Sequence, residues 1–139
     1  MEENKKISDH ISYYEATHSN TASRLSITNT PTPDVLKAMR NIAVNCFEPL
    51  RVWYGNPINI GSFYRSTLLN QAVKGSPSSQ HVRGEALDMT VGSKEGNKLI
   101  YDWCKENLEF DQLINEYDYS WVHISLKYAE NRNQTLSIT

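Results

Sequence analysis

The stretch SSQHVRGEALDMTV, Ser78 to Val91, joins a turn-rich loop to an apolar strand and places one chemically active side chain in each. Serine and glycine favour a loop up to Gly84, and the run EALDMTV is typical of a strand. His81 lies in the loop. Asp88 lies in the strand, where alternation directs its side chain away from its apolar neighbours. An acid inside such a strand is costly to bury unless it is paired or bound to a metal, so the stretch predicts a polar site beside a buried strand.

A second histidine offers a partner further along the chain. His123 lies in the middle of SWVHISL, residues 120–126, and shares a strand face with Trp121 and Ser125. Two histidine nitrogens and one carboxylate oxygen can form a three-ligand zinc site with an open fourth position. The face of Asp88 also carries Ala86 and Thr90, small residues that leave space. From these residues alone, a hydrogen-bonded structural role for the two histidines and Asp88 stays open beside the metal site.

The rest of the chain alternates between helical and extended patterns. Apolar residues recur at helical spacing from Val35 to Phe47, and Pro49 is expected to end this helix. A shorter helix in STLLNQAVKG is expected to end at Gly75. A second amphipathic helix is predicted from its inward stripe of Leu99, Ile100, Trp103, Cys104 and Leu108.

The extended segments indicate an antiparallel arrangement. INIGSFYR, residues 58–65, reads as a strand, and FDQLINE and SWVHISL form a predicted hairpin around YDY, with Glu116 at the end of its first strand. Residues 7–18 form either a short helix or an irregular packed arm, and residues 129–139 an edge strand or a loose polar tail. Helices early and paired strands late predict an α+β fold.

Composition narrows the class of protein. A chain of 139 residues with 39% apolar and 22% charged residues fits one globular domain over residues 1–139. The formal net charge of −2, with scattered lysines and arginines, argues against a nucleic-acid partner. No apolar run is long enough to span a membrane, and MEENKKISDH lacks the core of a signal peptide, so synthesis in the cytoplasm is expected. Cys46 and Cys104 lie in apolar helical patterns and are expected to be buried thiols.

Three segments together resemble one enzyme family. SFYRS (62–66), SQHVRGEALD (79–88) and SWVHISL (120–126) are similar, in this order, to segments of the zinc D-alanyl-D-alanine peptidases of family M15, especially its small phage- and mobile-element-associated branch. The family's loop pattern Ser-x-His-x-x-Gly-x-Ala-x-Asp is matched by Ser79, His81, Gly84, Ala86 and Asp88. The resemblance covers most of residues 8–128. It implies an antiparallel sheet with helices packed against it, as in hedgehog and D,D-peptidase domains.

The resemblance also implies roles for individual residues. His81, Asp88 and His123 would be zinc ligands. Arg65 would contact the scissile carbonyl and the oxyanion formed from it, because a fixed guanidinium stabilises charge that develops in the transition state. Ser79 would brace the loop or bind substrate, and Trp121 would line the cleft either as packing or as a substrate contact.

Several nearby residues receive other expectations. Gly84 is expected to allow a tight turn between His81 and the strand. Glu85 is expected to be non-catalytic, and His10 and His18 are expected to be exposed or structural.

One position departs from the family pattern. The family's general base is usually an acid three residues before the last histidine ligand, and here that position is Ser120, which cannot take a proton effectively. A hairpin would return Glu116 beside the ligand-bearing strand, so Glu116 is the preferred base. Asp118 is a shorter alternative whose carboxylate is expected to bond its own turn. A site with no protein base is the third possibility.

Two functions follow from the resemblance. The first is a zinc metallopeptidase that hydrolyses peptidoglycan stem peptides, either as a D,D-carboxypeptidase or as an L-Ala-D-Glu endopeptidase, and that reaches the cell wall after phage-type release. The second is a catalytically inactive, zinc-stabilised module that binds cell-wall peptide or a protein partner. The residue at position 120 favours the second, and Glu116 favours the first.

Overall fold

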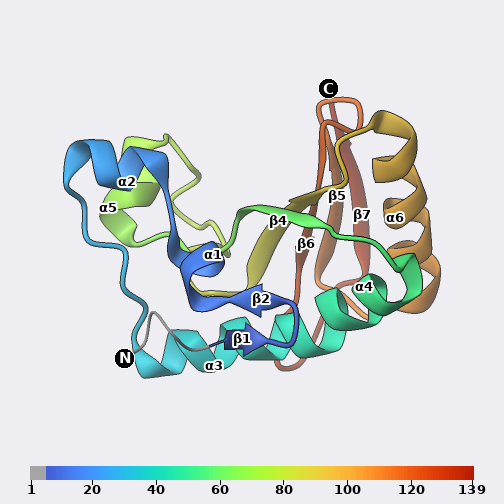
Figure 1. Ribbon diagram of the computed structural model, residues 1–139, viewed down its shortest axis with the longest axis horizontal. Helices are drawn as coiled ribbons and strands as arrows, with labels where there is room; N and C mark the ends of the chain where they lie inside the picture. Colours follow the sequence, from blue (N-terminus) through green and yellow to red (C-terminus); the bar gives the residue numbers. More distant parts are fainter. Residues whose placement is uncertain (1–5) are drawn as a thin grey trace.

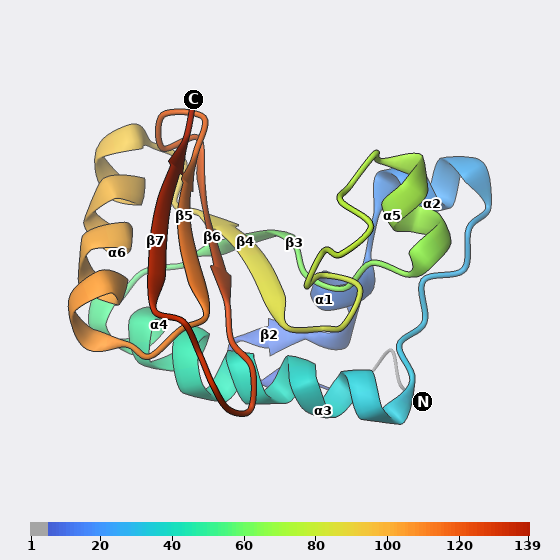
Figure 2. The ribbon, with the colours of Figure 1, turned by 180° about the vertical axis from the view of Figure 1, so that it is seen from behind.

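A five-stranded sheet forms the centre of the molecule, with strand order β3-β4-β6-β5-β7 (Figures 1 and 2). The structure, a computed structural model, describes residues 6–139. The sheet strands are β3 (Asn59–Ser62), β4 (Ala86–Thr90), β5 (Gln112–Glu116), β6 (Trp121–Ser125) and β7 (Gln134–Ile138). The helices are α1 (Tyr13–Thr17), α2 (Asn20–Leu25), α3 (Pro33–Ile42), the π-helical turn η2 (Ala43–Phe47), α4 (Glu48–Tyr54), α5 (Thr67–Ala72) and α6 (Lys94–Asn107). Strands and helices of this kind in one chain confirm the α+β prediction.

The sheet is mixed, so the expectation of a purely antiparallel sheet is wrong. β3, β4, β6 and β5 pair antiparallel, and β7 pairs parallel to β5. β6 ends where β5 begins, with Ile124 opposite Leu113. A loop over residues 126–133 therefore brings the chain around to start β7 beside the start of β5, which makes the two strands parallel. The tail over 129–139 thus contains an edge strand.

Strand alternation separates a core face from a polar face. Leu87, Met89, Val122 and Ile124 are at most 1% exposed and pack in the main core. The same core includes Ile100 of α6. Helix α6 contacts β5 and β6 along one side of the sheet (Figure 2). The intervening residues of β4 and β6, which include Asp88 and His123, consequently face the opposite side. That side is free to form the site.

The first long helix continues past Pro49, contrary to the sequence prediction. α3 leads into η2, and α4 then carries Pro49 in its first turn and ends at Gly55, where φ is +76°. Proline lacks the N–H that an α-helix needs in its interior. The wider turn of η2 ends at Phe47, so Pro49 falls in the first turn of α4, where a residue without an N–H is tolerated. Both cysteines are buried and free, as predicted, and burial raises the pKa of the Cys46 thiol to about 12.

Two segments before the site differ from the sequence expectations, one in its type of structure and one in its length. Residues 7–18 form a small hairpin, β1 (Lys6–Ser8) and β2 (Ile11–Ser12), followed by α1. The strand expected over 58–65 covers only Asn59–Ser62, because the next residues bond elsewhere: the Tyr64 N–H donates to Ala16 and the Arg65 N–H to His81. α2 and α5 cluster beyond the end of the sheet farthest from α6 (Figure 1). Within residues 6–139, no helix has the length and apolar character needed to cross a bilayer.

Candidate metal centre and cleft

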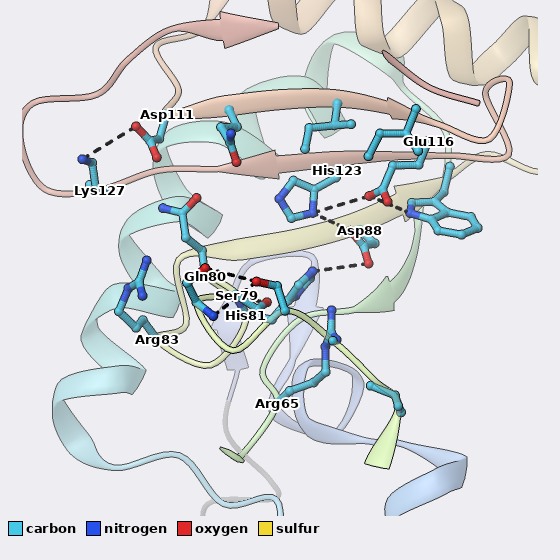
Figure 3. A pocket seen from close by; sticks show the side chains of 18 of the residues that line it. Arg65, Ser79, Gln80, His81, Arg83, Asp88, Asp111, Glu116, His123 and Lys127 are labelled. Atoms are coloured by element: carbon cyan, nitrogen blue, oxygen red, sulfur yellow. Dashed lines mark hydrogen bonds and ion pairs between the residues drawn. The ribbon is translucent and has the colours of Figure 1, made fainter. Parts of the chain in front are cut away.

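His81, Asp88 and His123 converge on the polar side of the sheet (Figure 3). Asp88 in β4 lies directly opposite His123 in β6, and His123 Nδ1 is 2.9 Å from Asp88 Oδ1. The loop before β4 brings His81 Nε2 within 3.4 Å of Asp88 Oδ2. One ligand atom from each of the three lies within 4.8 Å of the others. The three residues from distant parts of the chain therefore form one cluster that could hold a metal ion.

The ring of His81 is oriented as a metal ligand requires. Its Nδ1 is 2.7 Å from the carbonyl oxygen of Phe63, an acceptor that requires the proton to lie on Nδ1. The other nitrogen, Nε2, then carries a free lone pair and points at Asp88. It is buried and has no hydrogen-bond partner among the described residues. A second hydrogen bond that fixes the tautomer is the usual arrangement for ligating histidines, so the donor set fits zinc.

The charge state of Asp88 also suits a ligand. Burial by itself would raise the pKa of this carboxyl, but the hydrogen bond with His123 and the closeness of the His81 ring outweigh it and hold the pKa below its usual range. Asp88 is therefore an ionised carboxylate at neutral pH. An ionised, mostly buried carboxylate between two imidazoles is a strong attractor for a cation.

The loop geometry explains why the SQHVRGEALD stretch brings its histidine to the strand. Gly84 has φ +72°, as the expectation of a tight turn requires, and a Cβ there would lie 2.8 Å from atoms of Val35 and Met39 in α3. Ser79 Oγ accepts a hydrogen bond from the His81 N–H at 3.2 Å. Ser79 thus braces the loop, and its side chain also lines the cleft.

Glu116 is the acid nearest the cluster. It lies opposite Trp121 at the end of the β5–β6 hairpin, as expected, with Oε2 3.8 Å from His123 Nδ1. Trp121 Nε1 donates a hydrogen bond to the same oxygen at 3.1 Å. Asp118 lies in the turn with a 74% exposed side chain and pairs with Lys94. Ser120 Oγ donates to the carbonyl of Tyr117.

Arg65 approaches the cluster from the other wall. It follows β3, and its backbone N–H donates to the carbonyl of His81. Burial lowers the pKa of the guanidinium, while the negative charges of Asp88 and Glu116 raise it, and an arginine stays charged in either case. The positive charge of Arg65 therefore faces the two carboxylates across the space where a substrate would lie.

A cleft of about 880 Å³ unites the predicted site. The residues predicted as ligands, catalytic groups and substrate contacts all line it: Arg65, Ser79, His81, Asp88, Glu116, Trp121 and His123. The remaining candidates lie elsewhere: His10 and His18 are exposed, and Glu85 bonds Gln80 and Arg83.

Two residues at the cleft, Asn70 and Gly75, have no functional role in the sequence prediction, in which Gly75 only ends a helix. Asn70 is 3% exposed and bonds the Arg65 side chain, and Gly75 packs against both. Asparagine in the middle of a helix is unusual, and this is the one signal in the sequence that could have identified Asn70.

Two comparisons with known proteins were informative in different ways: one found no relative, and the other found a family. A comparison with curated proteins finds no match. The family model described as Peptidase M15 matches residues 9–125, which covers most of the chain and includes Arg65 and the whole His81, Asp88 and His123 cluster. The match begins in the N-terminal hairpin and ends in β6, so it takes in every residue predicted for the site. The chain therefore belongs to the peptidase M15 family.

Proposed function

We propose that this M15 peptidase is a zinc enzyme that hydrolyses an amide bond in peptidoglycan stem peptides. One observation carries the metal: the buried His81 Nε2, which has no hydrogen-bond partner within residues 6–139, points at a carboxylate and a second imidazole. His81, Asp88 and His123 would hold the ion. When bound, zinc supplies Lewis acidity, which polarises a carbonyl and brings the pKa of water to about 7.

The residues of the chain supply the other parts of the reaction. Glu116 is the general base: its carboxylate, held by Trp121, accepts a proton from the attacking water and later gives it to the leaving amine. Arg65 stabilises the negative charge that develops on the carbonyl oxygen in the transition state. His81 stays in one tautomer through the Phe63 carbonyl and keeps its orientation throughout.

The family and the charge of the cleft both support this substrate class. Arg65, Arg83 and Lys127 all line the cleft. Stem peptides carry free carboxylates, and basic side chains in a cleft that also holds Asp88, Asp111 and Glu116 suit such a peptide. Both the D,D-carboxypeptidase and the L-Ala-D-Glu endopeptidase reactions are compatible with this charge pattern. Action on the cell wall after phage-type release remains part of this proposal.

The alternative is a zinc-stabilised module that binds without cleaving. Ser120 at the usual position of the family's acid is the observation in its favour. Glu116 weighs against it, because its carboxylate lies within 3.8 Å of the His123 ring. The hairpin thus offers a base from the neighbouring strand in place of one from position 120.

The test joins metal content to hydrolysis. Purified wild type and His123→Ala are analysed for zinc by mass spectrometry and incubated with muropeptides whose products are separated by mass. We expect about one zinc per chain in the wild type, cleavage at a single type of bond, and loss of both in His123→Ala. Lys94→Ala, which changes an exposed residue of α6, is the control and should behave as wild type.

Each other result has a defined meaning. Zinc without cleavage of any muropeptide contradicts the enzyme and favours the binding module. A wild-type protein without bound zinc, whose thermal stability chelators leave unchanged, contradicts the metal centre itself.

A further inference from the structure

A buried asparagine beside the cleft contacts Arg65 and has no assigned role. Asn70 lies in α5 and is 3% exposed. Its Oδ1 accepts a hydrogen bond from Arg65 Nη1 at 3.0 Å, and its Nδ2 donates to the carbonyl oxygen of Ser76 at 2.9 Å. A single side chain thus joins the guanidinium to the loop that leads to Ser79 and His81.

Gly75 provides the space for this contact. Its N–H donates to the backbone carbonyl of Asn70 at 2.8 Å. A Cβ on Gly75 would overlap Asn70 Oδ1 and lie 2.7 Å from Arg65 Nη1. The φ of Gly75 lies outside the left-handed region, so the backbone conformation would accept a side chain, but its Cβ would have to displace the Asn70 amide and Arg65 Nη1.

Arg65 depends on this anchor for its position. The Nε atom of Arg65 is buried and has no hydrogen-bond partner among the described residues. Arginine has a long side chain with several rotatable bonds, and it loses much of its freedom when the guanidinium is held in one place. The bond that Arg65 donates to Asn70 uses Nη1 and leaves other N–H groups of the guanidinium free to face the cleft, which Arg65 lines.

We propose that Asn70 is a positioning residue that holds the Arg65 guanidinium in place for the substrate carbonyl, and that Gly75 is glycine because any side chain would displace this bond. The proposal rests on the proposed function, in which Arg65 stabilises the developing oxyanion. Asn70 itself does not touch the reacting atoms, and its effect on the reaction passes entirely through Arg65.

Two kinds of measurement test the proposal. The first is the NMR signal of the Arg65 side-chain N–H groups in the full-length protein, with Arg65→Lys used for assignment. The second is the set of kcat and KM values on the muropeptide that the wild type cleaves. The variants are Asn70→Ala, Gly75→Ala, Arg65→Ala and the double variant of Arg65 and Asn70. Gln71→Ala changes the exposed neighbour on the same helix and serves as the matched control.

We expect Asn70→Ala and Gly75→Ala to broaden or shift the Arg65 signals, whereas Gln71→Ala leaves them as in the wild type. Asn70→Ala should lower kcat about tenfold or more with little change in KM, because the contact between Arg65 and the carbonyl oxygen strengthens only in the transition state. The same change in the Arg65→Ala background should have no further effect, since residues that act as one unit are not additive. Zinc content should stay that of the wild type in every variant.

Several results would overturn the proposal. An equal loss of kcat from Asn70→Ala in both backgrounds would make Asn70 a purely structural residue of α5. Unchanged Arg65 signals in both Asn70→Ala and Gly75→Ala would contradict the anchor directly. If Asn70→Ala does not fold, Gly75→Ala alone decides. If the wild type cleaves no muropeptide, the proposed function fails, and the NMR signals still decide whether Asn70 holds Arg65.

Discussion

At the scale of single residues, the proposed base is distinguished from its neighbour by where its side chain points. Glu116 reaches the His123 ring, and Asp118 pairs with Lys94 at the surface. We expect Glu116→Gln to lower kcat by about 10²–10⁴-fold, the range for a lost general acid or base. Asp118→Asn should leave kcat unchanged. Both should keep wild-type zinc content, and equal losses in the two variants would remove Glu116 from the mechanism.

Trp121 is expected to act partly through Glu116. Trp121→Phe keeps a ring that can pack on Tyr117, 5.1 Å away between centroids, but loses the Nε1 donor to Glu116. A hydrogen bond to a charged group contributes about 1.5–3 kcal/mol, so we expect kcat to fall about ten- to a hundredfold. The same substitution in a Glu116→Gln background should change kcat little. A loss expressed only in KM would instead assign Trp121 to substrate binding.

Some residues of the candidate site could be predicted from the sequence, and others could not. His81, Asp88 and His123 stand out because side chains able to bind a metal lie within a loop and two apolar strands. Glu116 could be placed because a hairpin fixes which residues face each other. The contact between Asn70 and Arg65 is different, since it depends on how α5 folds back over the loop after Gly75. No local pattern encodes that approach.

At the scale of elements, the turn between the His81 loop and β4 depends on one glycine. Gly84→Ala combines a left-handed backbone with close contacts to α3, whereas Gly55→Ala, at φ +76°, meets no atom within 4 Å. We expect Gly55→Ala to cost about 1 kcal/mol in the free energy of unfolding, from backbone strain alone. Gly84→Ala should cost about 1–3 kcal/mol more, because the added methyl overpacks against α3.

Chemical denaturation of the two variants measures this difference. Gly84→Ala should also lower the affinity for zinc, since the turn sets the position of His81 relative to Asp88. Equal stability of the two alanine variants would show that the contacts with Val35 and Met39 relax without cost.

Elements themselves were predicted well where local signals act alone. The apolar spacing of α3 and of α6 identifies both helices, but Leu99, expected on the inward stripe of α6, is 52% exposed. Pro49 failed as a stop signal because the preceding turn is π-helical, which the sequence pattern does not distinguish from an α-helix. The strand over 58–65 was predicted too long because residues 63–65 bond to α1 and the His81 loop, which are contacts between distant segments.

At the scale of the whole molecule, β7 closes one edge of the sheet next to an ion pair between buried Asp111 and half-exposed Arg132. The Asp111 side chain is fully buried, and Arg132 contacts it with its backbone N–H, Nε and Nη2 at 3.0, 2.9 and 2.7 Å. These bonds hold the loop that carries the chain from β6 around to β7. A polar tail with two apolar residues gave no indication of parallel pairing, because the pairing is decided by this loop and by the position of β5.

The Asp111–Arg132 pair makes the stability of the fold dependent on pH. Hydrogen bonds and the charge of Arg132, acting against burial, lower the pKa of Asp111 to about 2. Because this pKa lies below that of an unfolded aspartate, the stabilisation is complete above the unfolded pKa and is lost as the pH falls toward the folded pKa. We expect Asp111→Asn to lower the free energy of unfolding at pH 7 by about 1–2 kcal/mol, less than the full shift implies, because the half-exposed Arg132 is screened by solvent.

Urea denaturation between pH 7 and pH 2 measures the difference in the free energy of unfolding between wild type and variant, which should shrink below about pH 4. Lys127→Gln is the control, because its Nζ lies 3.8 Å from Asp111 and should contribute much less. A difference that stays constant down to pH 2 would mean that Asp111 stabilises the loop through its shape and neutral hydrogen bonds, without its charge.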